Sequence, residues 1–228
     1  MSDRAPMVAL ISATSAAIHP AEAAFRRTFP SAVLWNLLDD RLLTEADQRG
    51  GLDAELYDRM GRLIDHAIAS GAAGALLTCS MYAPVAHAYS TGPTPVLASD
   101  DAAFERVAEL APPCVLVVGS LPSSLQDSCN RLRAALESRG ISVEVTGVVA
   151  KGAFEAAIAG DTERIVESIQ TAIEAHGGTD NAPVFLAQYS LAPAAGAVAD
   201  RLSVEVITGP DSSADLLRGR LTGTEGVP

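Results

Sequence analysis

Cys79 lies between two hydroxyl side chains, Thr78 and Ser80, where a short apolar segment gives way to a helical pattern. A thiol at the start of a helix is close to unpaired backbone N–H groups and to the positive end of the helix dipole, which both favour the thiolate. A thiolate can accept a proton or act as a nucleophile, and the flanking hydroxyls can donate hydrogen bonds to a carboxylate. A small side chain buried in the core explains Cys79 equally well at this point.

The remaining cysteines and the histidines form no local constellation. Cys114 follows two prolines at the start of an apolar segment, and Cys129 fits the apolar face of a helical pattern, so both are interpreted as structural. Three cysteines without a C-x-x-C spacing indicate neither a disulfide framework nor a zinc site. Two histidines could approach Cys79, namely His19 and His87.

Short apolar segments alternate with longer amphipathic patterns, which predicts an α/β fold with mostly parallel sheets. The clearest helical patterns cover 51–70, the segment from Ser123, where Ser-Ser-Leu-Gln is typical of a capping box, and the segment after Asp161. The predicted strands are Val8–Ser12, Ala32–Asn36, Ala75–Cys79, Pro95–Ala98, Val115–Ser120, Ser142–Val145, Val184–Gln188 and Val204–Ile207.

An internal repeat relates the two halves of the chain. Residues 75–88 align without a gap on 184–197, with 5 of 14 positions identical, and 8–12 align on 116–120 at nearly the same offset. The repeat predicts two similar lobes, 1–110 and 111–228, each with a roughly four-stranded, mostly parallel sheet flanked by helices. We expect a pseudo-twofold relation between the lobes, and the C-terminal segment could complete the first one.

The repeat makes Cys79 and Gln188 equivalent residues at strand ends. In open α/β sheets ligands bind beyond the carboxyl ends of the strands. A pseudo-twofold would therefore bring these two side chains face to face across a cleft, with Ser12 and Ser120 lining it. Glutamine cannot act as an acid or a base at neutral pH, so the chemistry would depend on one thiol.

Composition excludes several classes of protein. The chain has 228 residues, 48% of them hydrophobic, and a net charge of −12. That apolar content supports a real core, while the negative charge argues against nucleic acid and anionic membranes as partners. The apolar segment near the N-terminus is too short for a signal peptide or a membrane span, so we expect a cytoplasmic protein. No phosphate-binding glycine loop and no zinc-protease motif occurs.

Four segments together resemble the aspartate/glutamate racemase superfamily, which includes hydantoin racemases, arylmalonate decarboxylases and maleate isomerases. They are SATS at 12–15, the Thr78-Cys79-Ser80 strand end, GAFEAAIAGDTER at 152–164 and FLAQYSLA at 185–192. The resemblance implies two similar α/β lobes with one active site between them, in agreement with the repeat.

The resemblance also implies a reaction without a cofactor or a metal. In the family, one cysteine removes the proton next to a carboxylate and a second cysteine returns one. The first corresponds to Cys79, but the second falls on Gln188, where this sequence departs from the pattern. Three one-thiol reactions stay open: racemisation or epimerisation with water or another residue, such as His19, Lys151 or Tyr189, as the second acid, decarboxylation, and covalent isomerisation through Cys79.

We therefore expect an isomerase or lyase for a small carboxylate, with Cys79 as the catalytic group. The alternatives are a small-carboxylate binding protein without activity and, more remotely, a cysteine hydrolase. The sequence leaves open whether the protein forms a homo-oligomer. The residues expected to bind substrate are Ser12, Thr78, Ser80, Met81, Ser120, Ser123, Gln188, Tyr189 and Ser190.

Overall fold

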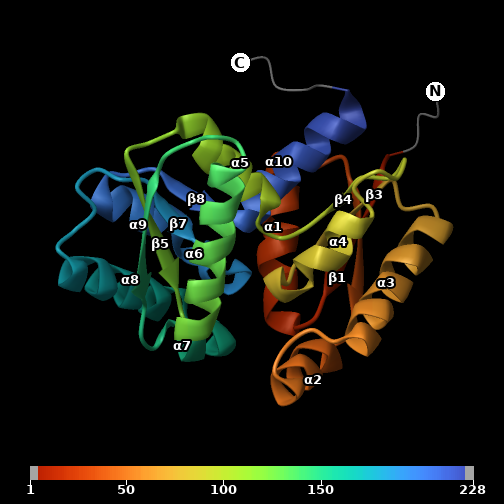
Figure 1. Ribbon diagram of the computed structural model, residues 1–228, viewed down its shortest axis with the longest axis horizontal. Helices are drawn as coiled ribbons and strands as arrows, with labels where there is room; N and C mark the ends of the chain where they lie inside the picture. The colour runs from red at the N-terminus through yellow and green to blue at the C-terminus, as the bar shows by residue number, and fades with distance from the viewer. Residues whose placement is uncertain (1–4, 224–228) are drawn as a thin grey trace. The chain divides into compact units, whose positions relative to one another are not determined.

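The computed structural model describes residues 5–223, apart from the side chain of Ser123. This part of the chain forms two compact units, 5–101 with 213–223, and 102–212 (Figure 1). Relative to the predicted lobes, 1–110 and 111–228, residues 102–110 belong to the second unit and 213–223 to the first. Each unit has a sheet of four parallel strands flanked by helices, which confirms the predicted fold class.

In the first unit the strands lie in the order β2-β1-β3-β4. They are β1 (Met7–Ser12), β2 (Val33–Leu38), β3 (Gly74–Leu77) and β4 (Val96–Leu97). The helices are η1 (Ser15–Ala17), α1 (Ile18–Thr28), α2 (Arg41–Arg49), α3 (Ala54–Ala69), η2 (Ser80–Tyr82), α4 (Ala83–Ala88) and the later part of α10 (Gly209–Thr222). The chain thus alternates strand and helix, as the apolar pattern predicts.

Alternation along β3 sends side chains to two faces of this sheet. Ala75 and Leu77 join the core formed with α2, α3 and α4. Gly74 points to the other face, where Leu217 of α10 packs so closely that an added Cβ would lie 3.1 Å from its Cδ2 atom. Helix α3 begins at the predicted segment because the Asp53 carboxylate accepts a hydrogen bond from the backbone N–H of Leu56.

In the second unit the order is β6-β5-β7-β8, the same topology as in the first. The strands are β5 (Cys114–Gly119), β6 (Glu144–Val149), β7 (Val184–Leu186) and β8 (Val206–Thr208). The helices are α5 (Asp101–Leu110), α6 (Pro122–Glu137), α7 (Ala153–Ala159), α8 (Thr162–His176), η3 (Tyr189–Ala194) and α9 (Ala195–Leu202). All eight predicted strands are present, with ends displaced by up to four residues.

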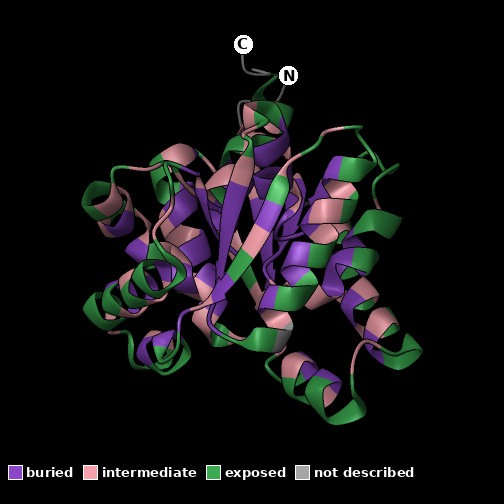
Figure 2. Ribbon diagram, turned by 60° about the vertical axis from the view of Figure 1, so that its left-hand side comes forward, coloured by how far each residue is buried: buried purple, intermediate pink, exposed green. Residues whose placement is uncertain are grey.

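The sheet of the second unit separates two cores. Leu116 and Val118 of β5 face the core formed with α7, α8 and α9, whereas Val115 and Val117 face the core formed with α5 and α6. Figure 2 shows strands that are buried along most of their length beside strands with exposed residues, and helices that are exposed on their outer sides. Burial on both faces explains why the central strands β5 and β7 are apolar runs in the sequence, whereas the edge strand β6 also contains Glu144 and Thr146.

The strand ladders correct the predicted alignment of β1 with β5. The N–H of Thr78 donates to Ile11 O in the first unit, and the N–H of the equivalent Ala187 donates to Val118 O in the second. Ser12 is therefore equivalent to Gly119, and Ser120 lies one residue further along than predicted. The shared closing serine misled the sequence comparison because a purely apolar strand offers little else to set the register.

The start of α6 also differs from the prediction. Leu121 is the N-cap and Pro122 is the first helical residue, so Ser123 does not cap the helix. Proline is favoured at this position because its ring presets the helical φ and the missing N–H would have no partner there. Gly119, just before, permits the close approach of α6, since a Cβ would lie 2.9 Å from the Cβ of Leu125.

Candidate active site

Cys79 and Gln188 occupy the same local structure in their units. Each is the extended N-cap of a 3-10 helix that follows a central strand, with φ and ψ of −118° and 119° at Cys79 and −138° and 138° at Gln188. Both side chains are partly exposed at the carboxyl edge of their sheet. The predicted helix after Cys79 is short, because α4 has only six residues, so its dipole favours the thiolate only weakly.

Ser12 and Thr78 are paired inside the first unit. The Thr78 hydroxyl donates to the Ser12 hydroxyl oxygen over 2.9 Å, and both residues are buried. The bond joins the ends of the neighbouring strands β1 and β3 directly before Cys79. It therefore commits the Thr78 proton to Ser12 and fixes the backbone from which the thiol projects.

Ser120 and Gln188 are paired in the second unit. Gln188 Oε1 accepts hydrogen bonds from the backbone N–H of Ser120 over 2.6 Å and from its hydroxyl over 2.8 Å. Both donors of Ser120 are thereby engaged, and Ser120 is itself buried. The pairing holds the Gln188 amide in one orientation.

Tyr82, three residues after Cys79, anchors the segment that carries the thiol. Its side chain is fully buried, its N–H donates to Cys79 O over 3.1 Å, and its hydroxyl donates to Leu42 O over 2.9 Å. Burial, and then the neighbouring Cys79 charge, raise the pKa of Tyr82 to about 12. Tyr82 thus keeps its proton at neutral pH and ties the Cys79 segment to α2.

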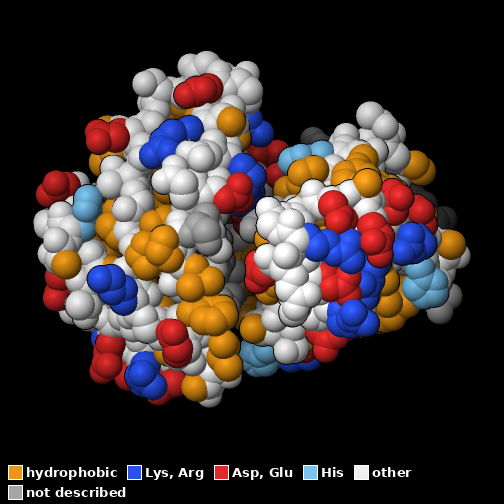
Figure 3. All heavy atoms as spheres, turned by 60° about the horizontal axis from the view of Figure 1, so that its bottom comes forward, with side chains coloured by type: hydrophobic (Ala, Val, Ile, Leu, Met, Phe, Trp, Pro, Cys, Tyr) orange, Lys and Arg blue, Asp and Glu red, His pale blue; other side chains and the backbone are white. Residues whose placement is uncertain are grey.

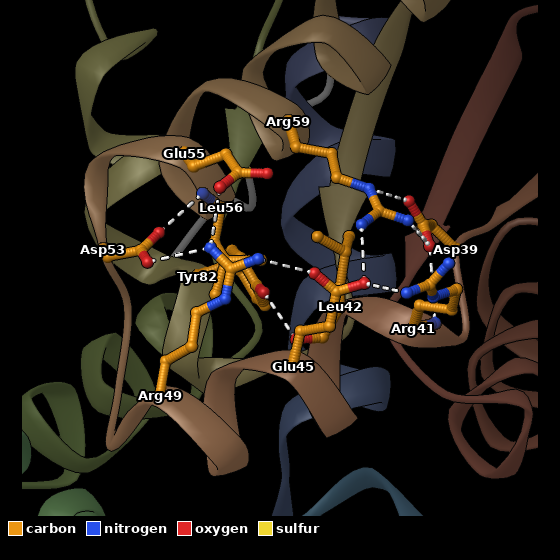
Figure 4. Close-up of polar contacts among 10 residues, drawn as sticks. All are labelled: Asp39, Arg41, Leu42, Glu45, Arg49, Asp53, Glu55, Leu56, Arg59 and Tyr82. Carbon is orange, nitrogen blue, oxygen red and sulfur yellow. Dashed lines mark hydrogen bonds and ion pairs between the residues drawn. The ribbon is translucent and has the colours of Figure 1, made fainter.

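An ion-pair network holds α2 in place (Figure 4). Arg59 of α3 makes two hydrogen bonds to the Asp39 carboxylate, of 2.6 and 2.7 Å, and a third to Glu45 of α2. The hydrogen bond from Arg59 is the largest cause that lowers the pKa of Glu45. Asp39 directly follows β2, and its N–H donates to Ser12 O over 3.0 Å. The network therefore reaches the strand end that is hydrogen-bonded to Thr78.

Sequence reasoning missed Asp39, Arg59 and Tyr82. The predicted second strand ended at Asn36, two residues short of Leu38, so Asp39 was not recognised as a strand-end residue. Arg59 lies on the polar side of α3, where a charge is ordinarily solvated. Asp39 and Arg59 are part of no short motif, and the side-chain partners of Arg59 and Tyr82 are 14 to 40 residues away in the sequence.

The other residues predicted to bind substrate lie close to these two strand ends in the sequence. Ser80 and Met81 are partly exposed in η2, and Ser190 is partly exposed in η3, whereas Tyr189 is buried. The side chain of Ser123 lies outside the described residues. Lys151 is exposed directly after β6.

Two of the histidines contact other residues of the first unit. His87 lies near the end of α4 and contacts both carboxylate oxygens of Asp101 over 3.0 Å. His66 makes an edge contact with the ring of Trp35, with 5.4 Å between centroids. His19 is exposed on α1.

Cys114 and Cys129 fit their structural interpretation. Cys114 lies at the amino end of β5, and Cys129 is buried under Gly147, where burial raises the pKa of its thiol. None of the three cysteines, all within the described residues, forms a disulfide. Across residues 5–223, no group of three or more His, Cys, Asp or Glu side chains could hold a metal.

Charges of both signs are interleaved on the face shown in Figure 3. Among the ion pairs of the first unit, Arg49 contacts Glu45, Asp53 and Glu55 at 2.9 Å each. In the part of the chain that the structure describes, no helix is long and apolar enough to cross a membrane.

Comparison with known proteins gives matches in structure but not in sequence. No protein-family model and no curated protein sequence matches the chain. Glutamate racemase RacE1 from Bacillus anthracis superposes with a TM-score of 0.71 at 12% identity, covering 97% of this chain and 84% of that one. Picrophilus torridus aspartate racemase gives 0.70 at 12% identity, covering 95% and 94%. Allantoin racemase from Klebsiella pneumoniae gives 0.68 at 17% identity, covering 95% and 88%. The chain therefore has the fold of the aspartate/glutamate racemase superfamily, in agreement with the resemblance in its sequence.

Proposed function

We propose that this protein is a racemase-type isomerase that acts next to the carboxylate of a small acid, with Cys79 as the group that carries the proton. The observation that carries the proposal is the place of Cys79. It is a partly exposed thiol at the carboxyl end of a central strand, in a fold whose solved neighbours include glutamate, aspartate and allantoin racemases.

The surroundings of Cys79 suit proton transfer. The Ser12–Thr78 pair and the Tyr82 anchor fix the backbone on both sides of the thiol. Fixed placement matters because a general base must lie within hydrogen-bond reach of the proton it removes. In this proposal the Cys79 thiolate takes the proton from the carbon next to the carboxylate, a water molecule returns a proton to the opposite face of the carbanion, and donors such as Ser80 bind the carboxylate oxygens. The reaction uses no cofactor.

Exchange of the substrate proton in deuterated water tests this function. The wild-type protein is incubated with both enantiomers of glutamate and aspartate and with allantoin, and deuterium at the reacting carbon is followed by NMR. We expect exchange with at least one compound, and a loss of about 100-fold or more in Cys79→Ala. Cys114→Ala makes the same change at the amino end of β5, and this variant should catalyse exchange at the wild-type rate. Equal rates in Cys79→Ala and the wild type would refute the role of Cys79.

One observation favours a second candidate, a lyase that decarboxylates a malonate. The residue equivalent to Cys79 is Gln188, which cannot carry a proton. Loss of carbon dioxide creates the carbanion by itself, so a single proton donor suffices. Release of carbon dioxide from phenylmalonate, dependent on Cys79 and without proton exchange in the amino acids, would favour the lyase. A protein that binds these acids but turns over none of them would be a binding protein instead.

A further inference from the structure

The orientation of the Gln188 amide follows from the chemistry of its partner. A backbone N–H can only donate, so the amide atom 2.6 Å from the Ser120 nitrogen must be the oxygen. The Ser120 hydroxyl donates to the same oxygen over 2.8 Å. Both lone pairs of Oε1 are thus occupied, and the amide nitrogen with its two protons is directed away from Ser120.

This amide is held before any ligand arrives. Ser120 is only 5% exposed, and the strands that carry the pair are joined where the N–H of Ala187 donates to Val118 O over 2.9 Å. Gln188 itself is partly exposed at the carboxyl edge of the sheet, where ligands of open α/β sheets bind. A side chain fixed in this way loses little rotamer entropy when its free end binds.

We propose that Gln188 is a specificity-determining residue whose Nε2 protons bind an acceptor oxygen, a carboxylate or a carbonyl, of a small acid at the carboxyl edge of the sheet of the second unit, while Ser120 positions the amide. The inference deepens the proposed function and rests on it for the substrate class. Equivalent positions of the two units then have different chemistry, because the thiol of Cys79 moves a proton and the amide of Gln188 only donates hydrogen bonds. Ligands that present a donor to Gln188 are rejected, since no acceptor of the amide is left.

NMR of the side-chain amides tests the donor role by following binding rather than turnover. The chain has four glutamines and three asparagines, so only seven NH2 pairs appear, and Gln188→Glu removes the one to be followed. Acetate, phenylmalonate and D-glutamate are titrated separately as probes. We expect at least one to move the Gln188 NH2 protons downfield in a saturable way, with the Gln126 amide unmoved. No saturable shift of the Gln188 amide with any probe overturns the proposal.

Substitutions separate a donor from a merely structural glutamine. The carboxylate of Gln188→Glu can still accept both hydrogen bonds from Ser120, but it has no proton to donate. For allantoin, an uncharged probe that the added carboxylate does not repel, a structural role predicts unchanged affinity, whereas a donor role predicts a loss of roughly 10- to 100-fold. Gln126→Glu adds the same charge on the exposed face of α6 and should bind like the wild type. Wild-type affinity in Gln188→Glu overturns the proposal.

Ser120→Ala tests the positioning. Removing one of the two hydrogen bonds should shift the Gln188 NH2 resonances in the ligand-free protein. It should also lower the affinity for the probe, by a smaller factor than Gln188→Glu does. Unmoved resonances would refute the role of Ser120. All these measurements concern binding, so they are distinct from the exchange assay: Cys79-dependent exchange with an indifferent Gln188 would leave the proposed function intact and remove only this inference.

Discussion

Tyr82→Phe should lower the free energy of unfolding at neutral pH, and at alkaline pH the variant should be more stable than the wild type. The substitution removes one hydroxyl from a fully buried side chain and with it the 2.9 Å hydrogen bond to Leu42 O. A neutral hydrogen bond of this kind contributes about 1 kcal/mol. At pH 8 we therefore expect the free energy of unfolding to fall by about 1 kcal/mol in the variant.

The alkaline effect follows from the pKa of Tyr82. Burial raises it from 10.0 to about 12, so the folded protein keeps a proton that the unfolded chain loses in this window. The contribution to stability is complete below about pH 10 and is lost as the pH rises through 12, which amounts to about 2–3 kcal/mol. Because phenylalanine cannot ionise, the variant should become more stable than the wild type near the upper end of this range.

Urea unfolding followed by circular dichroism at intervals from pH 8 to pH 12 measures both effects. The two curves of unfolding free energy against pH should cross. Tyr89→Phe provides a second case, since burial, followed by the Asp65 hydrogen bond, also raises the pKa of Tyr89 to about 12. If the Tyr82→Phe and wild-type curves run parallel throughout, Tyr82 does not keep its proton because of burial, and the account of the anchor is wrong.

Two further substitutions test how the elements around the site are held. Gly119→Ala places a methyl group 2.9 Å from the Cβ of Leu125 and should cost about 1–3 kcal/mol in urea unfolding, whereas Gly196→Ala meets nothing within 4 Å and should be neutral or stabilising. Asp53→Ala removes the cap of α3 and should lower Tm by about 2–4 °C at pH 7. The pKa of Asp53 is lowered, mainly by the Leu56 N–H, so its contribution is present above about pH 4 and lost below it, and Asp53→Ala should match the wild type near pH 2. A Tm difference that persists there would contradict the capping argument.

The sequence determined the fold class and one equivalence. Eight apolar segments between amphipathic patterns identify parallel strands with helices, because strands buried on both faces need continuous apolar side chains. The repeat also placed Cys79 and Gln188 at equivalent strand ends, and the local geometry of both agrees. The predicted cleft between these residues concerns the placement of one unit relative to the other, and it stays a prediction, as do the pseudo-twofold and the oligomeric state.

Only the tertiary structure decided which side chains at the strand ends are hydrogen-bonded to each other. The hydrogen bonds Thr78–Ser12 and Ser120–Gln188 join residues 66 and 68 positions apart, and no local pattern reports on them. The same holds for the link from Tyr82 to α2. Propensity and periodicity act over a few residues, whereas these contacts exist because parallel strands bring distant carboxyl ends to one edge of a sheet. The sequence identified Cys79 and Gln188 as candidate site residues. The sheet register brings Ser120 to the Gln188 oxygen, which leaves the Nε2 protons of Gln188 to donate.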